Sequence, residues 1–198
     1  MKLNWGVAGT ILGSDIAAGD APGVEYPCTS PNVICVGGTS TARSIATGNL
    51  LYQVAWMDAS GGSSAYEYRP YYQYPLRSLV GSRRGVPDIS FDANPTTGVW
   101  IYDSYPEEYW PGEYYPLGWD VFGGTSVGSP ALAGIVNAAG NFRHSSTDEL
   151  GTIYANRSNA ADYTDITMGF CGPYVTYSTL TGWDFCTGVG TPFGYSGK

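Results

Sequence analysis

Short apolar runs alternate with long polar connections along this chain, a pattern typical of a sheet that is covered by helices. Strands are predicted over residues 33–36, 50–56, 89–91, 99–102 and 121–122. Helices are predicted over 130–141 and, after a cap at Ser146 or Thr147, over 148–154. The connections 61–64 and 103–118 are expected to be loops. We find no repeat and no linker, so the chain is expected to form one α/β domain.

Residues 123–137 read Gly-Gly-Thr-Ser-Val-Gly-Ser-Pro-Ala-Leu-Ala-Gly-Ile-Val-Asn and indicate a nucleophilic serine, Ser126. Pro130 suits the first turn of a helix, and residues 131–139 are apolar on nearly every face, which predicts an interior helix. Ser126 is then expected just before the positive helix end, where backbone N–H groups stabilise an oxyanion. Taken alone, the segment favours the simpler interpretation of a helix N-terminus capped by Thr125 or Ser126 on a tight glycine turn.

Four segments together resemble the sedolisins, the serine-carboxyl peptidases with a subtilisin-like fold. The first is the Gly-Gly-Thr-Ser-x-x-x-Pro segment that contains Ser126. The second, Tyr26-Pro-Cys-Thr-Ser-Pro-Asn-Val-Ile-Cys-Val-Gly-Gly-Thr39, is similar to the family's Tyr-Pro-Ala-Ser-Ser-Pro-x-Val-x-x-Val-Gly-Gly-Thr. The third, Arg84-Gly-Val-Pro-Asp-Ile-Ser-Phe-Asp-Ala-Asn-Pro95, is similar to Arg-Gly-x-Pro-Asp-Val-Ser-x-x-Ala-x-Pro. The fourth combines Asp165-Ile166 with Gly182-Trp-Asp-Phe-Cys-Thr-Gly-Val-Gly-Thr-Pro192.

The resemblance implies a partial domain. It covers residues from about 16 to the end and corresponds to the C-terminal part of a sedolisin catalytic domain, with a doubly wound, mostly parallel sheet. Residues 1–198 are therefore expected to form the half that carries the nucleophile and a calcium site, and Met1 is expected to fall inside a longer protein. The family's serine proton is taken by a glutamate that is oriented by an aspartate four residues later. None of the six glutamates here has an aspartate at that spacing.

Other candidate bases are weaker. The single histidine, His144, lies in a polar stretch beyond the predicted helix, about 18 residues after Ser126, and is expected to be solvated. Asp88 and Asp92 are spaced four apart in a strand-like segment and are interpreted as hydrogen-bonded supports. Asp103 and Glu107 have the same spacing in a proline-containing loop.

Asp20 is the candidate oxyanion residue by resemblance. Ala17-Ala-Gly-Asp20 resembles the family's Ser-Ser-Gly-Asp-Ser-Gly, in which a protonated aspartic acid donates a hydrogen bond to the oxyanion. The Ser-Gly of the family pattern is replaced here by Ala21-Pro22.

Calcium is the cofactor that the resemblance implies. Its ligands would be two carboxylates and three backbone carbonyl groups, a donor set of hard oxygens that suits Ca²⁺. The residues are Asp165, Ile166, Leu180, Gly182 and Asp184. The leucine stands where the family has glycine but still offers its carbonyl oxygen. Alternatively, Asp165 caps a turn and Asp184 faces solvent.

Composition fits a secreted peptidase. A net charge of −8 argues against nucleic acid or an anionic membrane as partner, and the chain has no run of about 20 apolar residues that would span a bilayer. Four cysteines allow three pairings; Cys28–Cys35 and Cys171–Cys186 are favoured because each pair brackets a loop.

The predicted function is therefore a serine-type endopeptidase that acts on peptides or proteins at acidic pH and is inactive as this isolated part. Its missing N-terminal part would be a second partner. Two alternatives stay open: an inactive secreted binding module on the same half-fold, and a histidine-dependent subtilisin-like hydrolase.

Overall fold

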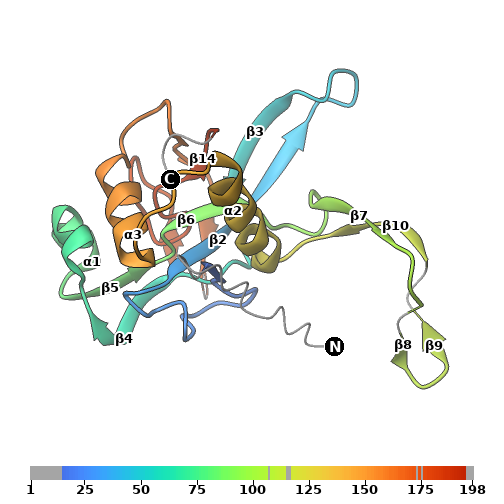
Figure 1. The fold of residues 1–198 in the computed structure, drawn as a ribbon, viewed down its shortest axis with the longest axis horizontal. Coiled ribbons are helices and arrows are strands. Elements are labelled where there is room, and N and C mark those ends of the chain that lie inside the picture. Colours follow the sequence, from blue (N-terminus) through green and yellow to red (C-terminus); the bar gives the residue numbers. More distant parts are fainter. Residues whose placement is uncertain (1–14, 107, 115–116, 173, 175, 195–198) are drawn as a thin grey trace.

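The computed structural model describes residues 15–106, 108–114, 117–172, 174 and 176–194. Its centre is a small sheet in which β2 (Ile34–Arg43) runs parallel to β1 (Asp15–Ala17) on one side and to β6 (Ile89–Asp92) on the other. β3 (Leu50–Ala55) pairs antiparallel with the second half of β2, and the two extend together beyond the body (Figure 1). This mostly parallel arrangement agrees with the expected α/β class.

β2 is much longer than the strand predicted over 33–36. Its second half reads Gly-Gly-Thr-Ser-Thr-Ala-Arg, which has no apolar run, yet it is paired along its length with β6 and β3. The two glycines allow neighbours to approach closely, because a Cβ on Gly37 would come within 2.6 Å of Pro87 and one on Gly38 within 2.8 Å of Ala93. Tertiary pairing therefore extends a strand that local propensity did not predict.

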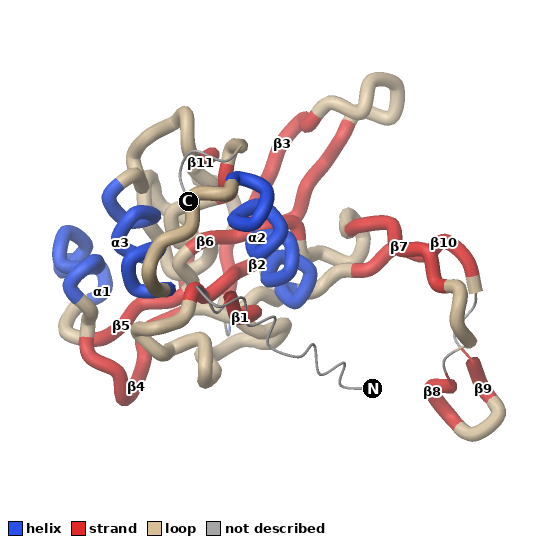
Figure 2. The backbone as a smooth tube through the Cα atoms, in the orientation of Figure 1, coloured by secondary structure: helices blue, strands red, loops and turns tan. Residues whose placement is uncertain are grey.

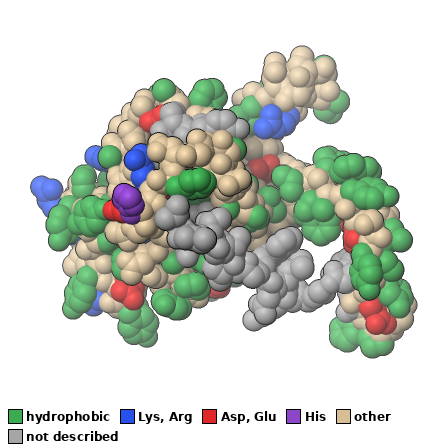
Figure 3. Space-filling view, viewed as in Figure 1, with side chains coloured by type: hydrophobic (Ala, Val, Ile, Leu, Met, Phe, Trp, Pro, Cys, Tyr) green, Lys and Arg blue, Asp and Glu red, His purple; other side chains and the backbone are tan. Residues whose placement is uncertain are grey.

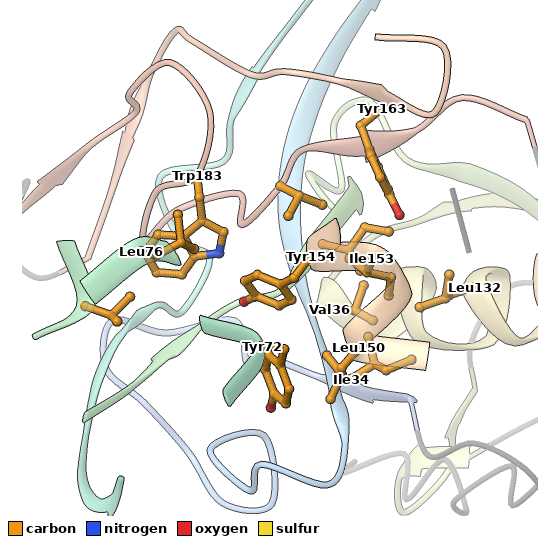
Figure 4. Close-up of a cluster of buried hydrophobic side chains, with 13 residues drawn as sticks. Ile34, Val36, Tyr72, Leu76, Leu132, Leu150, Ile153, Tyr154, Tyr163 and Trp183 are labelled. Atoms are coloured by element: carbon orange, nitrogen blue, oxygen red, sulfur yellow. The ribbon is translucent and has the colours of Figure 1, made fainter. Parts of the chain in front are cut away.

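The helices cover one face of the sheet. These are the 3₁₀ helix η1 (Tyr71–Leu76) and the α-helices α1 (Arg77–Val80), α2 (Thr125–Ala139) and α3 (Ser146–Ala155). Ile34 and Val36 of β2 point toward them, and the main core forms there with Leu132 of α2 and with Leu150 and Ile153 of α3 (Figure 4). Cys35 points to the opposite face, where it packs with Ala18, Cys28 and Val86.

Several short antiparallel pairs complete the described chain (Figure 2). β4 (Gly62–Tyr68) pairs with β5 (Arg83–Val86), so the prediction of a loop over 61–64 is wrong. β7 (Val99–Asp103) pairs with β10 (Gly118–Phe122), and the predicted loop between them contains the hairpin of β8 (Glu108–Trp110) and β9 (Glu113–Tyr114). The remaining pairs are β11 (Tyr163–Thr164) with β14 (Thr191–Pro192) and β12 (Phe170–Cys171) with β13 (Tyr177–Ser178).

Both long helices start earlier than their sequences suggested. α2 begins at Thr125, so Pro130 lies inside the helix and Ser126 lies within its first turn rather than before it. The prediction that α2 is interior is also wrong, since only Thr125, Gly128 and Leu132 of the helix are buried. α3 is capped by Ser145, whose hydroxyl accepts the Asp148 N–H at 3.1 Å, and not by Ser146 or Thr147.

Both favoured disulfides are present. Cys28 is bonded to Cys35, and Cys171 is bonded to Cys186. Among the described residues, no helix is long and apolar enough to cross a bilayer.

Arg84 and Asp88 form a buried ion pair. Arg84 and Asp88 are fully buried, and both carboxylate oxygens of Asp88 accept from the guanidinium at 2.7 and 2.8 Å. Asp88 also accepts the Cys35 N–H at 2.8 Å and the Tyr154 hydroxyl at 2.7 Å. Although burial by itself lowers the pKa of Arg84, the adjacent carboxylate raises that pKa above its ordinary value.

Asp92 is also a support. Its carboxylate accepts the hydroxyl groups of Thr41 and Thr97, each at 2.8 Å, and partial burial raises its pKa. The interpretation of Asp88 and Asp92 as hydrogen-bonded supports is confirmed.

Candidate active site

Ser126 is the second residue of α2 and is half-buried. Gly124 precedes the helix with a φ of 96°, and its N–H donates to the carbonyl of Ala93, which fixes the entry of the chain. Within the described residues, neither the N–H nor the hydroxyl of Ser126 has a recorded hydrogen-bond partner. Since the first N–H groups of a helix have no partner within the helix, both groups of Ser126 are free to engage a substrate carbonyl.

Asp20 lies directly beside this helix start. Its Oδ1 accepts the Thr125 N–H at 2.6 Å and the Thr125 hydroxyl at 2.8 Å, across 105 positions of sequence. The Thr125 hydroxyl in turn accepts the Gly19 N–H at 3.0 Å. The loop after β1 is thereby tied to the first residue of α2, and the structure brings Asp20 and Ser126 together.

The close approach of Asp20 requires glycine at position 124. A Cβ there would lie 2.5 Å from Oδ2 of Asp20, and the positive φ disfavours any side chain. Both hydrogen bonds from Thr125 go to Oδ1 of Asp20, so Oδ2 is the carboxylate oxygen that faces Gly124. Thr125 and Gly19 were not predicted as site residues; the position of Thr125 next to Ser126 in Gly-Gly-Thr-Ser was the available signal.

The candidate bases named from the sequence either lie far from Ser126, are held in other bonds or fall outside the described residues. His144 is exposed and follows the C-terminal end of α2. This end lies about 20 Å along the helix axis from Ser126, so His144 is not placed as a triad partner. Asp88 is paired with Arg84, and Asp92 is bonded to two threonines. Asp103 lies at the end of β7, and Glu107 lies outside the described residues.

Asp184 occupies the centre of a second candidate site. The side chain is buried, and its carboxylate accepts the N–H groups of Leu180, Cys186 and Thr187 at 2.8–3.0 Å. Burial raises its pKa despite these bonds. The alternative that Asp184 faces solvent is therefore wrong.

The other calcium candidates surround the same loop. The exposed Asp165 accepts the Gly182 N–H at 2.9 Å, so both carboxylates bond to the segment 180–184. Among the described residues, no hydrogen bond uses the carbonyl oxygens of Ile166, Leu180 or Gly182. A cavity of about 470 Å³ opens beside Asp165 and Gly182.

This donor set fits calcium better than a transition metal. No cluster of three or more His, Cys, Asp or Glu side chains occurs in the part of the chain that the structure describes. Two carboxylates and several open carbonyl groups are instead the hard oxygen donors that Ca²⁺ binds.

Known proteins match this fold and sequence. The chain is 32% identical to sedolisin of Pseudomonas sp. (strain 101) over 189 residues and 29% identical to kumamolisin of Bacillus sp. (strain MN-32) over 187 residues. A solved structure of Pseudomonas sedolisin, a serine-carboxyl proteinase complexed with pseudo-iodotyrostatin, superposes with a TM-score of 0.70 at 30% identity. The chain is therefore similar to the sedolisins over most of its length.

The chain spans only part of the length of the relatives that it matches. The sedolisin and kumamolisin matches cover 87% and 86% of the chain but only 29% and 31% of those relatives, and the solved sedolisin is covered over 52% of its length. Sphericase superposes with a TM-score of 0.51 at 21% identity, which supports the fold alone. No protein-family model matches the chain.

Proposed function

We propose that this chain supplies the nucleophile and the oxyanion site of a serine-carboxyl endopeptidase that cleaves peptides or proteins at acidic pH. The observation that carries the proposal is the Asp20–Thr125–Ser126 arrangement at the start of α2. Its relatives include a serine-carboxyl proteinase, which supports the same reaction class.

In the proposed reaction, the Ser126 hydroxyl oxygen attacks the peptide carbonyl carbon and loses its proton to a carboxylate base. The carbonyl oxygen becomes an oxyanion that accepts two hydrogen bonds, one from the Ser126 N–H and one from a protonated Oδ2 of Asp20. Collapse of this intermediate breaks the C–N bond, the amine leaves with the proton from the base, and water then hydrolyses the acyl ester. The base is proposed to come from sequence upstream of this chain.

Substitution of Asp20 tests its role as an oxyanion donor. In a protein that joins this chain to its native upstream sequence, Asp20→Ala is expected to lower kcat by about 10²–10³, the usual loss for one oxyanion donor. Asp20→Asn keeps an oxygen for Thr125 and an N–H₂ donor for the oxyanion, so it is expected to retain most of kcat.

Initial rates on a denatured protein substrate from acid to neutral pH give the measurement. If the role of Asp20 is purely structural, Asp20→Asn and Asp20→Ala will lose activity in parallel with their melting temperatures. That outcome would contradict the oxyanion role.

We also propose that the loop around Asp184 holds Ca²⁺ through Asp165, Asp184 and the carbonyls of Ile166, Leu180 and Gly182. A bound cation would neutralise two carboxylates that the fold holds against one loop. The bonds of Asp184 to the loop keep its carboxylate in place for this role.

The two disulfides fit a secreted setting, and the net charge of −8 does not favour nucleic acid as partner.

Calcium is expected to stabilise the fold. At a calcium concentration one hundred times Kd, the gain of about 2.7 kcal/mol would raise the melting temperature by roughly 5–10 °C relative to chelator. Asp184→Ala should melt lower and lose the calcium-dependent increment. Mg²⁺, which prefers smaller octahedral sites, should give a smaller shift. Equal melting curves in calcium and chelator for the unmodified chain would refute the site.

A further inference from the structure

A two-stranded arm leaves the body next to the candidate active site. The arm consists of β7, the β8–β9 hairpin and β10, spans residues 99–122, and projects away from the sheet and helices (Figure 1). Both of its strands join the body near the start of α2. Hydrophobic side chains cover much of its visible face, with acidic groups among them (Figure 3).

The strand register places three rings on one face of the arm. Trp119 lies directly opposite Tyr102, and Trp100, two residues before Tyr102, lies opposite Val121. Because side chains two apart point to the same side of a strand, Trp100, Tyr102 and Trp119 share a face. The rings of Tyr102 and Trp119 meet edge to face at 5.3 Å, yet the three side chains remain 67%, 59% and 67% exposed.

At the tip of the arm, each cross-strand neighbour pair of the β8–β9 hairpin combines an aromatic residue with a glutamate. Glu113 lies opposite Trp110 in the β8–β9 hairpin, and Glu108 lies opposite Tyr114. Trp110 and Tyr114 are 68% and 54% exposed. A carboxylate beside an aromatic face is a receptor for a cationic side chain, because the charge and the ring quadrupole both attract it.

The net charge of the arm also favours a cationic ligand. Residues 99–122 contain five of the chain's 17 Asp and Glu residues and none of its nine Lys and Arg residues or its single His. An exposed aromatic surface of this extent is typical of a binding site. Asp103 and Asp120 alternate to the face opposite the three rings, but the arm as a whole carries only negative charge, which favours a positively charged occupant.

The arm is also close to Ser126 along the chain. β10 ends at Phe122, and Trp119 is separated from Ser126 by a segment that spans at most about 25 Å when fully extended. An extended peptide held at Ser126 therefore reaches the ring face within roughly seven residues of the scissile bond.

We propose that the arm binds an extended, lysine- or arginine-rich segment of the polypeptide substrate, with cationic side chains stacked on Trp100, Tyr102 and Trp119. That the bound segment belongs to a substrate rests on the proposed peptidase function. The preference for a cationic segment rests on the residues of the arm alone.

Binding is measured on this chain carrying Ser126→Ala, so that cleavage cannot interfere. The probe is a fluorescein-labelled 12-residue peptide of alternating lysine and serine, followed by fluorescence anisotropy at low ionic strength. Matched peptides carry glutamate or glutamine in place of lysine. We expect the lysine peptide to bind at least tenfold more tightly than the glutamate peptide, with affinity falling as salt is added.

The variants locate the site. Trp100→Ala with Trp119→Ala is expected to weaken lysine-peptide binding roughly fivefold or more, since exposed cation–π contacts each contribute a factor of about two to five. Glu108→Gln with Glu113→Gln should weaken binding and flatten its salt dependence. Tyr66→Ala and Asp58→Asn, exposed positions on the body, serve as matched controls and should bind like the parent. Circular dichroism melts confirm that the variants are folded.

Three results would overturn the proposal. The first is a lack of selectivity, seen either as equal affinity for the lysine and glutamate peptides or as unchanged lysine-peptide affinity in the arm variants. The second is binding of a neutral glucan oligosaccharide, lost in Trp100→Ala, without lysine-peptide binding, which would assign the arm to carbohydrate. The third is a concentration-dependent dimer that only the arm variants abolish, without lysine-peptide binding, which would make the arm a self-association surface.

The same measurements separate the two proposals. Lysine-peptide binding by a protein that cleaves nothing even with its upstream sequence would refute the peptidase and leave the arm. Cleavage of lysine-rich substrates with a KM unchanged by the arm variants would refute the arm and leave the peptidase.

Discussion

The 198-residue chain alone is expected to cleave no protein substrate at any pH, although Ser126 is the proposed nucleophile. An unassisted serine hydroxyl reacts poorly, and loss of the base of a serine peptidase costs several powers of ten in rate. Among the candidate bases, His144 is remote from Ser126, and Asp88 and Asp92 are held in other bonds.

Joining the chain to its native upstream sequence is expected to restore cleavage at acidic pH, and Ser126→Ala in that protein should abolish it, by about 10⁴-fold or more. Rates on a denatured protein substrate from acid to neutral pH give the comparison. Ser129→Ala, on the same helix, serves as the matched control. Robust turnover by the bare chain that disappears with Ser126→Ala would show that an internal base exists. No activity from the joined protein would favour an inactive binding module.

Asp88→Asn is expected to destabilise the fold by about 3–5 kcal/mol, because it leaves the fully buried Arg84 guanidinium without its counter-charge. Asp88 also joins β2 to α3 through Cys35 and Tyr154, so the loss reaches both elements. Since whole domains are stabilised by only about 5–15 kcal/mol, a large fraction of the variant is expected to unfold.

Urea unfolding followed by circular dichroism measures the change. Tyr154→Phe removes the hydrogen bond that Tyr154 donates to the same carboxylate and the one that it accepts from Gln73, and should cost about 1–3 kcal/mol. Asp58→Asn changes an exposed carboxylate and should be nearly neutral. A loss for Asp88→Asn no larger than that for Tyr154→Phe would contradict the importance of the ion pair.

The sequence was most informative where chemistry is carried by short segments. The Ala-Ala-Gly-Asp20 and Gly-Gly-Thr-Ser126 segments were selected separately, and the structure joins them through Thr125. Both disulfides followed from the loops that they bracket. The disulfides depend on residue identity and spacing, which a single sequence displays, whereas Asp20 was indicated only by the resemblance to the sedolisin pattern.

The errors came from contacts between distant segments. α2 starts at Thr125 because the Asp20 carboxylate, 105 positions away, accepts the Thr125 N–H; Pro130 suggested a later start. β4 and the second half of β2 are strands because a partner pairs with them, although small and polar residues dominate them. Local propensity carries no information about such partners.

The root of the arm matters for protein engineering. Val99 and Phe122 are paired where the arm meets the body, and Gly98 is packed so tightly that a Cβ there would lie 1.9 Å from the carbonyl oxygen of Phe122. A segment whose two ends meet at a fixed point can change in length or be exchanged without moving Gly124 or Ser126. The arm is therefore a suitable place for protein engineers to graft a different hairpin onto an unchanged body.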